Sequence, residues 1–260
     1  MTWKRGISCG ISEIFSLSSV FHKYRPGFRV LMYHAVGTNI SDDPLGIYSI
    51  DSRLFRQHMA FLIQMTGVSV VGFEDGKGSG EALEIAVTFD DGYKDNLYVA
   101  APILQDFNIP FSVFVSTQFV KDGSAEYLDE AELKELAAIP GAAIGAHGVK
   151  HLALADLKPG ELKRELLDSR HYLEDVLGKP IQSMSYPHGS ISQQVRDAVE
   201  EAGYLRAACS RSDINDAFRD RLLLCRTMID ARDSQRNFKQ KLRGNWDWYR
   251  YLQKDVKVHE

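Results

Sequence analysis

The sequence predicts a single-domain α/β protein made of parallel βα units, arranged as in a βα barrel. Three observations support this prediction. Seven or so apolar strand segments alternate with helical segments. The composition is uniform over all 260 residues, with no Pro/Ser-rich linker and no internal repeat. The segment at residues 84–89 is apolar on both faces, which is typical of a central strand in a sheet covered by helices.

The individual elements follow in order along the chain. Strands are expected at residues 28–33, 68–71, 84–89, 111–115, 142–146, 183–186, 205–209 and 222–227. Helices are expected at residues 51–65, 95–107, 129–139, 159–178 and 192–203, with a last one from about residue 233. Three helices have end signals: an N-cap at Asp51, a capping box of Asp129 and Glu132, and a first-turn Pro159 with a terminal Gly178.

The composition excludes several classes of protein. The formal net charge is −4 and 25% of the residues are charged, so no nucleic-acid partner is expected. The three cysteines (Cys9, Cys209 and Cys225) are far apart and lack C-x-x-C spacing, which favours a reduced compartment over a disulfide framework. We therefore expect the protein in the cytoplasm or at the periphery of the inner membrane, rather than secreted.

Both ends of the chain are expected to lie outside the barrel, which would span residues 28–230. Residues 1–27 have the outline of a signal peptide, but Glu13 and several serines break the apolar stretch and no A-x-A-like cleavage site follows. A retained amphipathic segment is favoured, which packs on the body or makes peripheral membrane contact. Residues 231–260 form a helix and an aromatic tail, where Trp246, Trp248 and Tyr249 either pack on the barrel or stack on sugar rings.

Chemically competent residues follow the predicted strands. In a βα barrel, functional side chains gather at the C-terminal ends of the strands. His34, Asp90, Asp91, His147 and His188 all fall at such ends. The adjacent carboxylates of Asp90 and Asp91 repel each other unless a cation lies between them. The pair is therefore either solvated in an Asp-Gly turn or placed there for chemistry.

His147 and His151 are four residues apart, so both can reach one ion if the loop turns helically. Two surface histidines could also occur at this spacing. The preceding strand is made of small residues, which leaves room for a pocket. Two histidines and one aspartate form a set with open positions for water and substrate, which is typical of a catalytic metal site.

Three motifs in this order and spacing resemble the polysaccharide deacetylase family, the carbohydrate esterases that share the chitooligosaccharide deacetylase homology domain. They are T-F-D-D-G (88–92), H-x-x-x-H (147–151) and S-Y-P-H-G (185–189), and the likeness runs from about residue 28 to 227. The resemblance implies a distorted seven-stranded β/α barrel that hydrolyses N-acetyl groups of a sugar polymer or lipid-linked sugar. By position, Asp90 would be the general base, and Asp91, His147 and His151 would bind a divalent metal.

Zinc is the expected metal, and cobalt, nickel or manganese could serve. The resemblance also assigns residues 186–188, which are Tyr186, Pro187 and His188, to the substrate and oxyanion side of the site. The backbone N–H of His188 would be the oxyanion donor.

Two departures from the family pattern need a replacement residue. Ser185 stands where the family usually has the Arg that pairs with the base, and the usual late Leu-x-His is absent, since the last histidine is His259. Tyr33-His34 resembles the variant in poly-N-acetylglucosamine deacetylases, so His34 is expected to act as general acid, the alternative being a strand cap. Arg226, at the end of a predicted strand, is proposed to tether Asp90, the alternative being a surface ion pair.

Two other functions compete with sugar deacetylation. A deformylase or cyclic amide hydrolase of the same fold would keep the site and change the substrate. A catalytically impaired sugar-binding protein would follow from the two departures. An Asp-x-Asp phosphatase fits poorly. Its two aspartates would be separated by one other residue, whereas Asp90 and Asp91 are adjacent.

Overall fold

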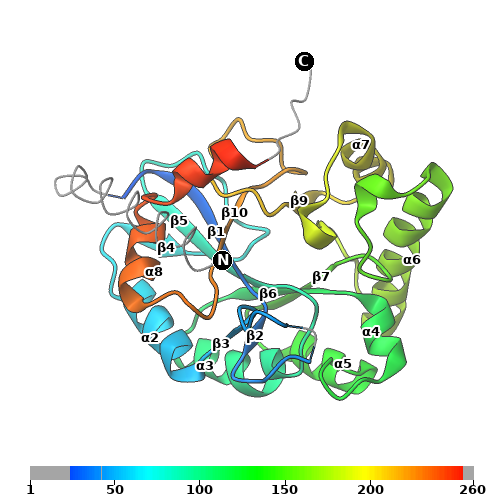
Figure 1. The fold of residues 1–260 in the computed structure, drawn as a ribbon, viewed down its shortest axis with the longest axis horizontal. Helices are drawn as coiled ribbons and strands as arrows, with labels where there is room; N and C mark the ends of the chain where they lie inside the picture. Colours follow the sequence, from blue (N-terminus) through cyan, green and yellow to red (C-terminus); the bar gives the residue numbers. More distant parts are fainter. Residues whose placement is uncertain (1–23, 42, 254–260) are drawn as a thin grey trace.

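A computed structural model describes residues 24–41 and 43–253 and shows a parallel sheet with helices around it (Figure 1). The single-domain α/β architecture expected from the sequence is confirmed. The strands of the large sheet are β1 (Gly27–Tyr33), β4 (Val68–Val70), β5 (Leu83–Phe89), β6 (Phe111–Val115), β7 (Ala142–Ala146), β8 (Ser183–Ser185), β9 (Arg206–Ala208) and β10 (Arg226–Met228).

Seven of these strands form a nearly closed barrel in the order β10-β1-β5-β6-β7-β8-β9. Every ladder along this path is parallel. A single parallel bridge between Ala208 and Leu224 joins the two ends, so the ring is weakest between β9 and β10. β4 lies off the path and pairs with the first half of β5, while β6 pairs with its second half. The expected distorted seven-stranded barrel is therefore confirmed.

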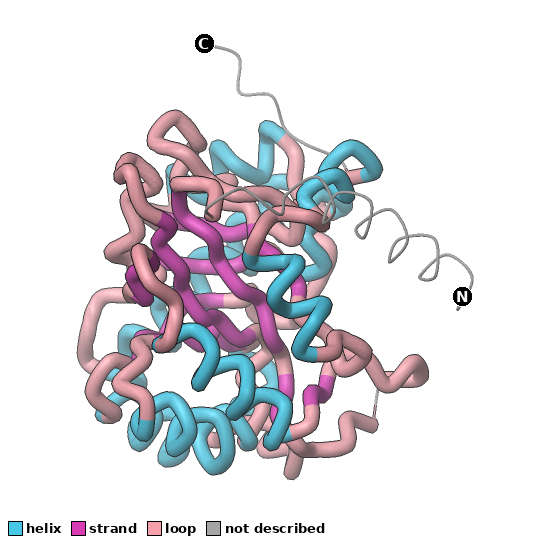
Figure 2. Tube along the Cα trace, turned by 90° about the vertical axis from the view of Figure 1, so that its left-hand side faces the viewer, coloured by secondary structure: helices cyan, strands magenta, loops and turns pink. Residues whose placement is uncertain are grey.

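Helices surround the strands of the sheet (Figure 2). They are α2 (Ser52–Ile63), η1 (Asn96–Ala100), α3 (Ala101–Asp106), α4 (Thr117–Asp122), α5 (Glu130–Ala138), η2 (Leu154–Asp156), α6 (Pro159–Leu177), η3 (Pro187–Gly189), α7 (Gln193–Glu201), α8 (Gln235–Leu242) and η4 (Asp247–Leu252). The expected end signals are present. Asp51 caps α2, Asp129 and Glu132 form the capping box of α5, and Gly178 ends α6 in a left-handed conformation.

The apolar core has two layers, one inside the barrel and one between the strands and the helices. Phe28, Val30, Ala86 and Phe114 belong to the inner cluster. The outer cluster is larger and joins the strands to the surrounding helices. Successive strand residues point to opposite faces, so the inward phase of β5 that includes Ala86 also includes residues 88 and 90. Asp90 therefore points into the barrel.

Several elements differ from the expectation, each for a local reason. The expected helix at 95–107 is a π-helical turn, η1, followed by α3, because Pro102 has no N–H to continue the regular ladder. β10 begins at Arg226, not at residue 222, because the Asn215 side chain binds both the N–H and the C=O of Cys225. The helix expected from about residue 233 is α8, which begins at Gln235 with Ser234 as its N-cap. α4 and the small sheet of β2 (Ala35–Val36) and β3 (Ser49–Ile50) were not expected from the sequence.

The C-terminal segment up to Gln253 is attached to the barrel through polar side chains. Asp247 forms a two-pronged ion pair with the buried guanidinium of Arg29 on β1, at 2.8 and 2.9 Å. The side chain of Gln253 bonds to the backbone of Ser210 and Ser212 after β9. The expected amphipathic segment at the N-terminus falls largely on residues 1–23, outside the described residues.

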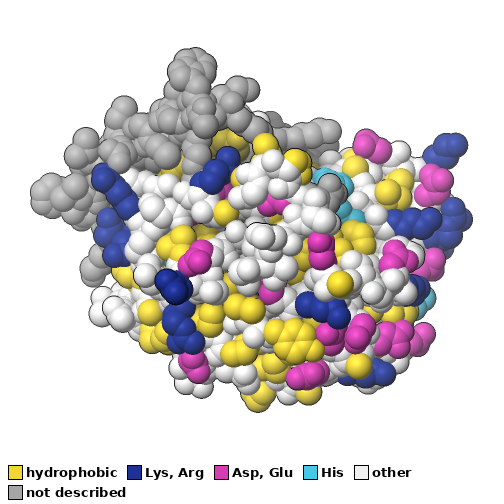
Figure 3. All heavy atoms as spheres, turned by 60° about the horizontal axis from the view of Figure 1, so that its bottom comes forward, with side chains coloured by type: hydrophobic (Ala, Val, Ile, Leu, Met, Phe, Trp, Pro, Cys, Tyr) yellow, Lys and Arg dark blue, Asp and Glu magenta, His cyan; other side chains and the backbone are white. Residues whose placement is uncertain are grey.

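On the face shown in Figure 3, acidic side chains lie among basic ones. Within the described ranges, no helix combines the length and the apolar character needed to cross a bilayer. Cys209 and Cys225 are both buried free thiols.

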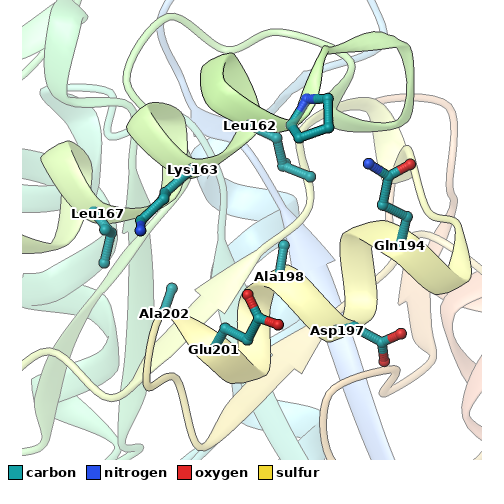
Figure 4. Close-up of a pocket in the computed structure, with 9 residues that line it drawn as sticks. Leu162, Lys163, Leu167, Gln194, Asp197, Ala198, Glu201 and Ala202 are labelled. Atoms are coloured by element: carbon teal, nitrogen blue, oxygen red, sulfur yellow. The ribbon is translucent and has the colours of Figure 1, made fainter.

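A hollow of about 740 Å³ lies between α6 and α7, on the outside of the barrel (Figure 4). Its charged side chains are Lys163 of α6 and Asp197 and Glu201 of α7. No histidine or cysteine lines it. This hollow therefore offers no imidazole or thiolate group.

Candidate active site

The C-terminal ends of the parallel strands bring the predicted site residues to one rim. Asp90 and Asp91 follow β5, His147 follows β7, and Pro187 and His188 follow β8. His34 follows β1, which pairs with β5 over its whole length. The register explains the convergence, because parallel strands end at the same edge of the sheet.

Three side chains, those of Asp91, His147 and His151, point their ligand atoms at one another. One ligand atom from each lies within 4.8 Å of the other two. The Oδ1 atom of Asp91 is 3.4 Å from Nε2 of His147 and 3.2 Å from Nε2 of His151. This oxygen is buried and has no hydrogen-bond partner among the described residues. A buried carboxylate oxygen without a partner is costly unless a cation lies beside it.

The proton position on His147 follows from its other ring nitrogen. Nδ1 of His147 lies 2.9 Å from the carbonyl oxygen of Ser185 and 2.5 Å from its Oγ. A carbonyl oxygen can only accept, so Nδ1 carries the proton and donates it. The Nε2 atom then presents a lone pair toward Asp91. Two electron-rich atoms thus face each other across the site, which is the arrangement of metal ligands held by an outer hydrogen bond.

The electrostatics fit a divalent cation at this point. Burial lowers the pKa of His147 to about 3, and burial together with the neighbouring His188 lowers the pKa of His151 to about 4. Both imidazoles are therefore neutral at neutral pH, as a metal ligand must be. Burial, together with the charge of Asp90, raises the pKa of Asp91 to about 6. One carboxylate and two neutral imidazoles form the donor set of a catalytic zinc-type site.

The backbone at the site is strained. Asp91, His151 and His188 have φ values of 73°, 55° and 57°, and among the described residues Asn108 is the only other non-glycine with positive φ. Such conformations cost about 1–3 kcal/mol each and cluster at functional sites. The loop from His147 to His151 does not turn helically, because Gly148 has a φ of 72° and His151 is left-handed too. The two rings converge through this irregular turn.

Asp90 is held by Arg226 inside the barrel. The two guanidinium nitrogens donate to the two carboxylate oxygens at 2.7 Å each, and the Arg226 side chain has no exposed surface. Arg226 is fixed in turn by a bond from Nε to the carbonyl of Cys209. The predicted contact is therefore present, although Arg226 begins β10 and does not end it. β1 lies between β10 and β5 in the sheet, so the contact reaches across one intervening strand.

This clamp gives the two aspartates opposite character. Burial alone would raise the pKa of Asp90, but the charge and hydrogen bonds of Arg226, with His147, hold it well below its usual range. Ser185 Oγ also donates to Asp90 Oδ1, at 3.1 Å. Asp90 is therefore ionised and anchored, whereas Asp91 is free to bind a cation. The crowded pair is not a solvated turn, because both residues are buried.

His34 lies beside the carboxylate pair. A charge on its ring would be close enough to lower the pKa of both Asp90 and Asp91. Its ring packs on Tyr48 with the centroids 4.7 Å apart, and its Nδ1 is buried without a partner among the described residues. The Asn96 side chain holds the His34 carbonyl at 2.9 Å. The ring is thus positioned at the rim with one nitrogen uncommitted.

The loop after β8 contributes unequally to the site. Tyr186 is wholly buried and its hydroxyl donates to the carbonyl of Leu222, so its side chain supports the loop from below. Pro187 begins η3. The ring of His188 lies tilted against that of His151, with the ring centroids 4.3 Å apart, and its Nε2 donates to the His151 carbonyl. The N–H of His188 lies in the first turn of η3, where backbone donors have no partner within the helix.

Two further residues contribute to the site. Ser185, which stands where the family usually has an Arg and can offer one neutral hydrogen bond but no charge, links His147 to Asp90 through its hydroxyl. Tyr93, directly after the Asp-Asp-Gly turn, is a hydrogen-bond partner of Asp91. Nothing in the local sequence distinguishes a rim serine or tyrosine from an ordinary one. The position of Ser185 at a strand end was the available signal.

Comparison with known proteins gives consistent matches. The sequence profile of the family described as Polysaccharide deacetylase matches residues 77–207, half of the chain. YxkH of Bacillus subtilis (strain 168), named as a polysaccharide deacetylase, is 28% identical over 182 residues. That alignment covers 67% of this chain and 61% of YxkH, so it leaves more than a third of the relative unmatched.

Two solved structures have the same fold. The Streptococcus pyogenes deacetylase PplD, solved in complex with acetate, matches with a TM-score of 0.73 at 23% identity, covering 83% of this chain and 98% of PplD. IcaB from Ammonifex degensii matches with a TM-score of 0.72 at 22% identity, covering 86% of this chain and 99% of IcaB. At these identities the likeness demonstrates a shared barrel.

Proposed function

Because this chain belongs to the polysaccharide deacetylase family, we propose that it is a metal-dependent hydrolase that removes N-acetyl groups from an amino-sugar glycan. One observation carries the proposal. Asp91, His147 and His151 form a metal-type donor set, and the ionised Asp90 lies directly behind it. Fixed asymmetry between the two aspartates is what base-assisted hydrolysis needs.

Asp91, His147 and His151 would hold the ion, with zinc as the best match to the donor set and cobalt, nickel or manganese as alternatives. When bound, a divalent ion supplies Lewis acidity, which acidifies a water molecule and polarises the amide carbonyl. Asp90 takes the proton of the attacking water on Oδ2, the oxygen that lies 4.0 Å from Nε2 of His147. Arg226 fixes the orientation of that oxygen.

The remaining roles fall to the two loops at the rim. The oxygen of water bonds to the acetyl carbon, and the N–H of His188 stabilises the oxyanion that forms. The bond from carbon to nitrogen then breaks, and the sugar amine leaves with a proton from His34. The Arg226 clamp removes one reason for regarding the site as impaired, because the base has a cationic partner from another strand.

The substrate is proposed to be an N-acetylated sugar polymer, with a lipid-linked sugar as a variant. The acetate in the PplD structure is the kind of product that this reaction releases. Peripheral membrane contact through the N-terminal segment, and a location in the cytoplasm or at the inner membrane, remain predictions.

The proposed function is tested by product analysis. Purified protein loaded with zinc should release acetate from N-acetylglucosamine oligomers, and a chelator should abolish the release until the metal is restored. Formate release from formyl-sugars without acetate release would favour the deformylase. A protein that retains its metal and releases neither product from a panel of bacterial glycans would be a binding protein.

The His34→Ala variant should lose turnover by roughly 10²-fold while it keeps its metal. A general acid donates only while it is protonated, so its removal should also flatten the alkaline fall of the pH–rate profile. The measurement is kcat against pH with metal content determined in parallel. His171→Ala, which replaces an exposed histidine of α6, serves as the control. Wild-type rates in His34→Ala at every pH would reduce His34 to a strand cap.

A further inference from the structure

The conformation of the turn between His147 and His151 depends on hydrogen bonds to other parts of the fold. With left-handed residues at Gly148 and His151 it makes no helical ladder, so its backbone groups need partners elsewhere. A misplaced turn would separate the two imidazole rings. The partners of this turn therefore determine whether both rings face the same point.

The start of α4 binds the carbonyl groups of the turn. Ser116 Oγ donates to the carbonyl of His147 at 2.9 Å. The backbone N–H of Thr117 donates to the carbonyl of Gly148 at 3.2 Å, and that of Gln118 to the carbonyl of Val149 at 2.8 Å. Three consecutive carbonyls are thus fixed from one side.

Glu165 of α6 binds the amide groups of the turn from the other side. A single carboxylate oxygen, Oε2, accepts from the N–H of Val149 at 2.7 Å and from that of Lys150 at 3.0 Å. Glu165 is only 6% exposed, so its carboxylate is largely shielded from solvent. A buried carboxylate is costly unless it is hydrogen-bonded, and these two amides supply the hydrogen bonds.

Gly148 completes the fit. A Cβ atom at this position would lie 3.1 Å from Oε2 of Glu165 and 3.5 Å from Cγ of Pro187. The glycine therefore lets the carboxylate approach the turn closely while keeping the left-handed φ that a side chain would strain. Turn, carboxylate and η3 form one packed unit behind the ligand pair.

We propose that Glu165 is a positioning residue for the metal centre, holding the 148–150 turn against α4 so that His147 and His151 converge on one ion. The proposal rests on the metal site of the proposed function. Its physical basis is preorganisation. Without the hydrogen bonds from Glu165, the turn would have to become ordered when the ion binds, and the loss of conformational entropy would lower the affinity for the ion. Outer hydrogen-bond partners of metal ligands typically contribute 10- to 100-fold in affinity.

The sequence contains a signal for this residue that is visible only in retrospect. Glu165 lies on the apolar face of α6, in the row of buried residues with Leu162, Leu166, Ser169 and Leu173. A glutamate at a core position of an amphipathic helix needs a buried partner. Which partner it has depends on the packing of α6 against the rim.

The test compares Glu165→Ala and Glu165→Gln with Asp168→Ala, which removes an exposed acid from the same helix. Two quantities are measured: the zinc dissociation constant by competition with a chromophoric chelator, and hydrogen exchange of the Val149 and Lys150 amides in metal-free protein. Glu165→Ala should raise the dissociation constant by about 10- to 100-fold and speed exchange at both amides. Glu165→Gln should change both quantities less than Glu165→Ala does, because its amide oxygen can still accept the two hydrogen bonds. Asp168→Ala should match wild type in both.

Exchange in β6 reports whether a variant remains folded as a whole. Wild-type zinc affinity and wild-type amide protection in folded Glu165→Ala or Glu165→Gln would overturn the proposal. If the wild-type protein binds no zinc, the metal assignment fails, while amide exchange still decides whether Glu165 holds the turn. The two failures are thus separable.

Discussion

The Asp90→Asn variant is expected to keep its metal and to lose turnover by about 10²-fold or more, because a carboxamide cannot accept the proton of the attacking water. The carboxylate is clamped by Arg226 and Ser185 and lies 4.0 Å from His147. It therefore lies next to the three converging side chains that would hold the ion, without being one of them. The measurement pairs acetate release with metal stoichiometry on the same preparation.

Asp91→Asn is the matched comparison, because it makes the same replacement of a carboxylate by a carboxamide at the adjacent residue. Its Oδ1 faces both histidines, so this variant should lose most of its metal and with it the activity. Metal loss in Asp90→Asn combined with full metal in Asp91→Asn would exchange the two roles. Circular dichroism should accompany both measurements, since Asn at position 90 leaves the buried Arg226 without a counter-charge.

Replacing Arg226 with Met should damage both turnover and stability. The guanidinium orients both oxygens of Asp90, and a base that loses its orientation costs roughly 10- to 100-fold in rate. Removing one partner of a buried pair typically costs about 3–5 kcal/mol in the free energy of unfolding. Arg226 holds the pKa of Asp90 down against burial, so its loss raises that pKa and shifts the acid limb of the pH–rate profile to higher pH.

The Arg29→Met variant is the control for the stability part of this effect. Arg29 is as fully buried as Arg226 and forms the same two-pronged pair, but with Asp247 and away from the rim. It should destabilise the fold without moving the pH profile. Arg226→Lys should recover part of the turnover, because an ammonium keeps the charge and loses the fork. An unchanged acid limb in Arg226→Met would mean that Arg226 only supports the fold.

The ion pair between Arg226 and Asp90 also predicts how the stability of the fold depends on pH. The pair contributes fully to the free energy of unfolding above the pKa that Asp90 has in the unfolded chain. This contribution is lost as the pH falls through the pKa of Asp90 in the folded protein, which lies well below the usual range. At neutral pH the stability loss of Arg226→Met should therefore be largest, and it should shrink on acidification.

The sequence by itself determined the order of the elements and the location of the site. The runs at 84–89, 111–115 and 142–146 are short, apolar and bounded, and they are strands at nearly these limits. The caps at Asp51 and Asp129 act on the nearest turn of backbone, so they are readable locally. Because every barrel strand is parallel, the residue after each strand must lie on one rim, and this alone gathers the histidines and aspartates.

Only the tertiary structure decided how those residues are held. The clamp on Asp90 joins residues 136 positions apart across an intervening strand, and the link from Ser185 to Asp90 joins residues 95 apart. The left-handed turn after His147 depends on α4 and on Glu165 of α6, neither of which its own sequence reveals. Such contacts depend on strand order, barrel closure and side-chain packing, which no local pattern encodes. Local patterns thus place the chemistry at the rim, and long-range contacts give Asp90 and Asp91 their different electrostatic character.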